Sequence, residues 1–123
     1  MNPFTRSLLH RNTNVSLQAF VARWDALEAL VIRVYRNGTA STADCDEHRA
    51  LRPLLLLDYQ RWREPLRPCW RVARCGSKPC EEDPFEFLLR VETPVRFVGS
   101  WEHMQALPAA REALNRLLLE TQP

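Results

Sequence analysis

A single apolar repeat near the start of the chain constrains the fold more than any other feature. Apolar side chains follow one another at intervals of 3, 4, 3, 4 and 3 residues, at Leu17, Phe20, Trp24, Leu27, Val31 and Val34. This spacing places them on one face of an α-helix. Asn14 or Ser16 can cap the start, and Gly38 follows the end. The pattern predicts a long amphipathic helix over Ser16–Asn37.

A second long helix is predicted over Thr42–Arg63, with Thr42 as its cap. Its apolar positions are spaced by 4, 4 and 3 residues, at Leu51, Leu55, Tyr59 and Trp62. Pro53 lies inside this pattern and predicts a bend near Arg49, because proline lacks a backbone donor. Pro65 and Pro68 are predicted to end the helix. The short connection to the first helix predicts that the two are antiparallel.

The rest of the chain has weaker signals. Residues 66–83 are predicted to be an irregular loop, with a short helix around Cys69–Arg74. Asp83 followed by Pro84 predicts a capped helix reaching about Val91. Ser100 predicts another start, with Trp101, Met104 and Leu107 facing inward, and Pro108 opens a last helix to about Thr121. The alternative is a β-hairpin over 85–98, because apolar residues alternate there.

Size and composition favour one folded domain over residues 1–123. Hydrophobic residues make up 46% of the chain and charged residues 26%, which is usual for a globular domain. We expect an all-α bundle built on two long antiparallel helices, with shorter C-terminal helices and an irregular loop that contains Cys and Pro. The predicted core contains Phe20, Trp24, Leu27, Val31, Leu51, Leu55, Leu114 and Leu117. Residues 1–14 are expected to form a loosely ordered arm.

The start of the chain does not resemble a secretory signal, because Arg6, His10 and Arg11 interrupt its apolar residues. No apolar stretch approaches the roughly 18 residues that a membrane helix needs. We therefore expect a cytoplasmic protein with no membrane partner.

Two ionisable residues fall within apolar faces. Glu28 lies among the apolar positions of the first helix, and His48 lies among those of the second. Because each sits about ten residues from Gly38, antiparallel packing would place them at similar heights. Burial of a charged group requires a partner, so the sequence predicts that Glu28 and His48 form a buried polar pair, or that either contacts a nearby arginine such as Arg49 or Arg52.

The four cysteines are Cys45, Cys69, Cys75 and Cys80. The last three could complete a zinc site with His48 or Cys45, but their spacings of five and four intervening residues lack the tight two-residue knuckle of structural zinc sites. A bond between Cys75 and Cys80 is another alternative. In a cytoplasmic chain we expect reduced thiols, no metal and no cofactor.

Charge is unevenly distributed between residues 49 and 78. This segment holds eight basic residues against Asp58 and Glu64 alone, and aromatic residues are interleaved with them. Arginine and aromatic side chains together suit single-stranded RNA or DNA. The nucleic-acid-binding candidates are Arg61, Arg63, Arg67, Trp70, Arg71 and Arg74. In the alternative interpretation, Trp62 and Trp70 face the core and the arginines extend to water.

One enzyme motif has a partial counterpart. Arg96 and His103, with six residues between them, resemble the Arg-x4-6-His motif of HEPN ribonucleases, which are small helical bundles. In that family one helix presents both residues, whereas Gly99–Ser100 predicts a helix break here, so we do not assign the chain to it. P-loop, Rossmann, G-x-S-x-G and H-E-x-x-H motifs are absent from the sequence. No catalytic residue is predicted.

The second predicted helix carries more leucines than one face can bury. Leu54, Leu56 and Leu57 point away from the face of Leu51 and Leu55. Exposed apolar patches mark interfaces, so we expect a noncatalytic protein-interaction or regulatory module that binds another protein or itself. The alternatives are an RNA- or DNA-binding protein using residues 49–78, and a small metal-binding or enzymatic protein using His48 and the cysteines.

Overall fold

The computed structural model describes residues 3–74 and 83–120, with side chains described for residues 17–62 and 83–119. Its elements are α1 (Pro3–Asn37), α2 (Thr42–Arg74), α3 (Pro84–Leu89), the 3₁₀ helix η1 (Pro94–Phe97) and α4 (Trp101–Glu120). Throughout these ranges the regular elements are helices, which confirms the all-α bundle. The alternative hairpin over 85–98 is wrong, since α3 and η1 occupy that segment.

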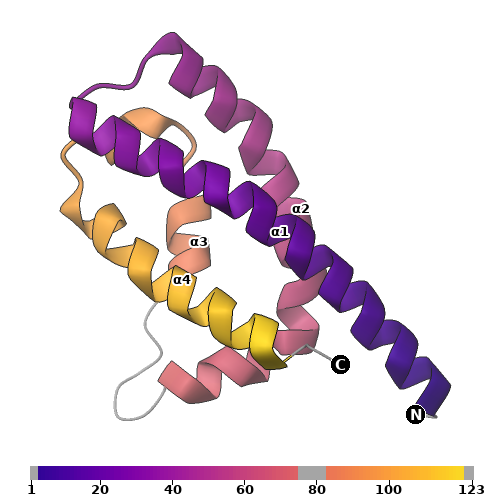
Figure 1. The fold of residues 1–123 in the computed structure, drawn as a ribbon. Coiled ribbons are helices and arrows are strands. Elements are labelled where there is room, and N and C mark those ends of the chain that lie inside the picture. Colours follow the sequence, from indigo (N-terminus) through magenta and orange to yellow (C-terminus); the bar gives the residue numbers. More distant parts are fainter. Residues whose placement is uncertain (1–2, 75–82, 121–123) are drawn as a thin grey trace.

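The two long helices form the frame of the bundle. Figure 1 shows α1 and α2 running antiparallel, with α4 beside α1 and α3 lying between α4 and α2. Gly38 turns the chain at a φ of 70°, which glycine adopts without strain. Ser41, rather than the predicted Thr42, caps α2: its hydroxyl accepts from the Asp44 amide at 3.1 Å, and the Asp44 carboxylate accepts from the Ser41 amide at 3.0 Å.

Both long helices extend beyond their predicted ends. The first begins at Pro3 instead of Ser16, and the second reaches Arg74 instead of ending at Pro65 and Pro68. A proline inside a helix removes one hydrogen bond and bends the axis, but it need not stop the helix. Figure 1 shows the last turns of α2 leaving the earlier direction of its axis. The bend expected near Arg49 stays a prediction, as does the loosely ordered arm.

The C-terminal helix is also longer than expected. Pro108 lies inside α4, which is one helix and not two. The reason is visible in its buried face, which continues across the proline through Leu107, Ala110, Leu114 and Leu117. Burial of this face compensates for the single missing hydrogen bond.

The core is centred on aromatic rings contributed by three helices. Phe85 of α3 has its ring centroid within 5.3–5.9 Å of those of Phe20, Trp24, Tyr59 and Trp62. The predicted core is confirmed for seven of its eight residues, and Leu51 is half-buried. Trp101 was expected to face inward but is 57% exposed, because the first turn of α4 places it beside Tyr35 at the surface, with the ring centroids 6.2 Å apart.

The short helix α3 starts as predicted. Asp83 caps it, accepting from the Phe85 amide at 2.8 Å, and Pro84 occupies the first turn. The Tyr59 hydroxyl donates to the other carboxylate oxygen of Asp83. The helix ends at Leu89, two residues before the predicted end at Val91. At this end the Arg52 side chain donates to the Leu89 carbonyl at 2.8 Å. These bonds fix α3 against α2.

Among the described residues, no helix combines the length and the apolar character needed to cross a membrane.

Candidate functional site

The predicted polar pair is replaced by other contacts. Glu28 accepts from Arg111 of α4 at 3.2 Å, and Arg111 also donates to Asp25 at 2.5 Å. His48 is buried with its ring 6.0 Å from that of Phe97. Burial lowers the pKa of His48, and the charge of Arg52 lowers it further. The structure gives no hydrogen bond between Glu28 and His48, so the half-buried carboxylate is satisfied by an arginine and the histidine packs as a neutral ring.

The predicted metal ligands are only partly within the described side chains. Cys45 is half-buried, whereas Cys69, Cys75 and Cys80 lie outside the described side chains. Over residues 17–62 and 83–119, no three histidine, cysteine or acidic side chains gather as a metal site would require. The zinc alternative therefore receives no support from the described side chains, His48 included.

The basic segment is likewise only partly described. Arg61 is exposed, but the side chains of the other candidates, Arg63, Arg67, Trp70, Arg71 and Arg74, lie outside the described ones. Two interleaved aromatic residues, Tyr59 and Trp62, are buried in the core. Their rings are unavailable for stacking on bases, as the alternative interpretation predicted for Trp62.

The outer face of α2 carries an exposed apolar stripe. Leu54 and Leu57 are 43% and 45% exposed, and Ala50 and Pro53 beside them are also exposed. These four residues, named here the α2 stripe, recur at helical spacing and therefore share one side of the helix. Leu56, predicted with them, is half-buried and packs against the core.

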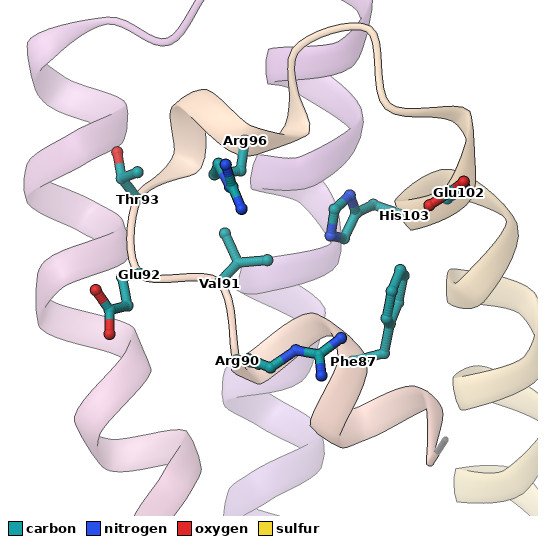
Figure 2. Close-up of a pocket in the computed structure, with 8 residues that line it drawn as sticks. All are labelled: Phe87, Arg90, Val91, Glu92, Thr93, Arg96, Glu102 and His103. Carbon is teal, nitrogen blue, oxygen red and sulfur yellow. The ribbon is translucent and has the colours of Figure 1, made fainter. Parts of the chain in front are cut away.

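A second surface feature is a cavity of about 500 Å³ between α3, η1 and α4. Figure 2 shows Arg90 and Phe87 below it, Arg96 entering from η1, and His103 entering from α4. The side chains of Arg96 and His103 point toward one another across the space above Val91. Two cations, one imidazole and an aromatic ring thus converge on one concave surface.

The His103 ring is held in place from three directions. It stacks on Phe87 with centroids 4.7 Å apart and planes 19° apart, and it meets the edge of Phe97 at 5.2 Å. Its Nδ1 lies 2.5 Å from the Ser100 hydroxyl oxygen, which also accepts from the His103 backbone amide at 3.4 Å. Fixed contacts of this kind keep one orientation of the imidazole.

Burial is the main cause that lowers the pKa of His103. The charge of Glu102 raises this pKa, whereas the charges of Arg96 and Arg90 lower it. Arg90 lies 5.8 Å from the centroid of Phe87, over the ring face. The Arg96 guanidinium makes no ion pair or hydrogen bond with any described residue. An arginine with no direct partner among the described residues therefore borders the cavity, together with Glu92 and Glu102.

Sequence reasoning noted Arg96 and His103 only as a partial motif. It correctly separated them, because Arg96 lies in η1 and His103 in α4. It missed that the turn between the two elements returns them to one cavity together with Phe87 and Arg90. The predicted helix cap at Ser100 was the sequence signal for this arrangement, because it fixes where α4 begins after η1 and so where His103 lies.

No protein-family model, curated protein or solved structure matches this chain.

Proposed function

We propose that this protein is a noncatalytic, cytoplasmic interaction module whose α2 stripe binds an apolar groove on another protein. The observation that carries the proposal is the exposure of Leu54 and Leu57, at 43% and 45%. Both lie on the side of α2 that faces away from the buried residues Leu55, Tyr59 and Trp62. Amphipathic helices bind grooves through side chains at i, i+3, i+4 and i+7, and Ala50, Pro53, Leu54 and Leu57 have this spacing.

Charge at the ends of the α2 stripe defines the partner further. Arg49 precedes Pro53 by one turn and Arg61 follows Leu57 by one turn. Both arginines are exposed, Arg49 with 80% of its side chain accessible. An apolar centre with a charged rim is the usual composition of a protein interface. The complementary partner has an apolar groove bordered by acidic residues.

The RNA- and DNA-binding alternative has less support. Base stacking uses exposed aromatic rings beside the arginines, and Tyr59 and Trp62, the aromatic residues of this segment among the described side chains, are buried. Arg52, another member of the basic segment, is engaged with the Leu89 carbonyl. Exposed leucines would contribute nothing to phosphate binding, whereas they are the main feature of the outer face of α2.

Photo-crosslinking in cells tests the proposal. The photoreactive residue p-benzoylphenylalanine is placed at Leu54 or Leu57, and at Leu119 as the matched control. Leu119 is 70% exposed and lies outside the α2 stripe. We expect a discrete protein adduct from positions 54 and 57 and not from 119. An adduct that disappears on nuclease treatment, or equal labelling at all three positions, would contradict the proposal.

The recovered partner then allows a quantitative test. Its Kd is measured by calorimetry against the unmodified protein, the double variant Leu54→Glu with Leu57→Glu, and the control Leu119→Glu. If the two leucines contribute about 1 kcal/mol each as central apolar residues of the interface, the double variant should weaken binding roughly 30-fold. The control should stay within about twofold. Unchanged affinity in the double variant, with an unchanged circular dichroism spectrum, would contradict a role for the α2 stripe.

A further inference from the structure

We propose that the cavity between α3, η1 and α4 binds a small aromatic oxyanion, whose carboxylate or phosphate is held by Arg96 and His103. This site is separate from the α2 stripe and does not depend on the function proposed for it. Its volume of about 500 Å³ lies within the range of small-molecule sites.

The first argument is charge. Arg96 is exposed to the cavity and has no hydrogen bond or ion pair among the described residues. A guanidinium matches the geometry of carboxylate and phosphate groups with two parallel hydrogen bonds. Glu92 and Glu102 also border the cavity, but Figure 2 shows the Glu92 carboxylate turned away from the space between Arg96 and His103. Arg96 therefore supplies a positive charge, with no direct partner among the described residues, at the edge of this space.

The second argument is the hydrogen on His103. The Ser100 hydroxyl oxygen lies 2.5 Å from Nδ1, and the hydroxyl can donate to that nitrogen when the imidazole carries its hydrogen on Nε2. A neutral imidazole that accepts at Nδ1 carries its hydrogen on Nε2. Nε2 is then a donor on the cavity side of the ring, and it can share the oxyanion with the Arg96 guanidinium.

The third argument concerns the rest of the ligand. Val91 forms an apolar surface between the two donors, and the Phe87 ring lies beneath His103. Flat apolar groups pack favourably on such surfaces. An aromatic acid or aryl phosphate would place its charged group at Arg96 and His103 and its ring against Val91, since His103 and Arg90 already lie over the ring of Phe87.

Calorimetry or ligand-observed NMR with three probes tests the ligand class. The probes are phenyl phosphate, benzoate and the uncharged benzyl alcohol, each titrated into the full chain. Probes of this size reach affinities on the order of 1 mM. We expect at least one of the anions to bind at least tenfold more tightly than benzyl alcohol, and the ratio of the two anions assigns phosphate or carboxylate. Equal binding of the alcohol and both anions would overturn the proposal.

Paired arginine variants test the site. Arg96→Gln should weaken binding of the preferred anion at least tenfold. Arg36→Gln removes the same charge from an exposed position outside the cavity and should change the Kd less than twofold. His103→Phe keeps the ring contacts with Phe87 and Phe97 but removes the donor, and it should weaken binding several-fold. Equal effects of Arg96→Gln and Arg36→Gln would reduce the interaction to general electrostatic attraction and overturn the proposal.

The histidine offers a readout independent of affinity. An anion bound beside His103 would favour its protonated form and raise its pKa, whatever the contributions of Arg90, Arg96, Glu92 and Glu102 around it. NMR titration of the His103 ring should therefore show a higher pKa with the preferred anion than with benzyl alcohol. The same pKa with both would place the anion elsewhere and overturn the proposal.

Discussion

Asp83 makes the stability of this protein depend on pH in an unusual direction. Burial raises the pKa of its carboxyl group from 3.8 to about 7, and the charge of Glu86 raises it further, against the hydrogen bonds from the Phe85 and Glu86 amides. The folded protein therefore holds a proton here that the unfolded chain has released above about pH 4. Because the folded state then binds more protons, its stability falls as pH rises from about 4 to about 7.

The variant Asp83→Asn isolates this effect. Asparagine keeps an oxygen for the Phe85 amide and gains a donor for the Tyr59 oxygen, so the cap is retained. A pKa change from 3.8 to about 7 corresponds to about 4 kcal/mol at roughly 1.4 kcal/mol per pH unit. The unfolding free energy of the variant minus that of the original protein should therefore increase by about 4 kcal/mol from pH 4 to pH 8.

Urea unfolding followed by circular dichroism, at half-unit pH steps, measures this difference. His48 and His103 have lowered pKa values, so they make the folded state more stable as pH rises toward their ordinary range. Both proteins share that contribution, and it cancels when one curve is subtracted from the other. A difference that stays constant within about 1 kcal/mol from pH 4 to pH 8 would refute the argument from burial.

Three further substitutions test the packing and the backbone. Trp24→Ala removes a fully buried ring in contact with Phe20 and Phe85 and should destabilise the protein by roughly 3 to 5 kcal/mol in urea unfolding, whereas a loss below about 1 would contradict the assigned core. A β-carbon added at Gly38 would meet no atom within 4 Å, so only the positive φ opposes Gly38→Ala. We expect the free energy of unfolding to fall by about 1 kcal/mol. An unchanged free energy of unfolding would show that the turn relaxes. Pro108→Ala supplies a donor inside α4 and should raise the melting temperature, with stability increased by about 1 kcal/mol or more; a lower melting temperature would show that the proline is needed there.

Local periodicity was sufficient for the frame of the fold. Repeats such as Leu17 to Val34 report one buried face directly, and they predicted the two long helices and most of the core. Helix ends were predicted less well near proline, because α2 continues past Pro65 and Pro68 and α4 continues through Pro108. Pro108 lies inside α4 because the apolar face continues through Leu107 and Ala110, and that burial depends on the neighbouring helices.

Partners distant in the sequence could not be predicted. The helical wheel correctly marked Glu28 as needing a partner, but Arg111 lies 83 positions away and is brought near only by the packing of α4 on α1. The cavity shows the same principle, because Phe87, Arg96 and His103 belong to three elements. The sequence shows which residue types are present, whereas their meeting at one cavity depends on the turns between α3 and η1 and between η1 and α4.

The aromatic cluster has a consequence for how α3 opens to solvent. A helix of six residues is unstable by itself and its amides would normally exchange with deuterium quickly. Here Pro84, Phe85, Leu88 and Leu89 are buried, and the Phe85 ring is surrounded by rings of α1 and α2. The short helix cannot detach without exposing the centre of the core. Its Leu88 and Leu89 amides should exchange only through global unfolding, as slowly as those in the middle of α1.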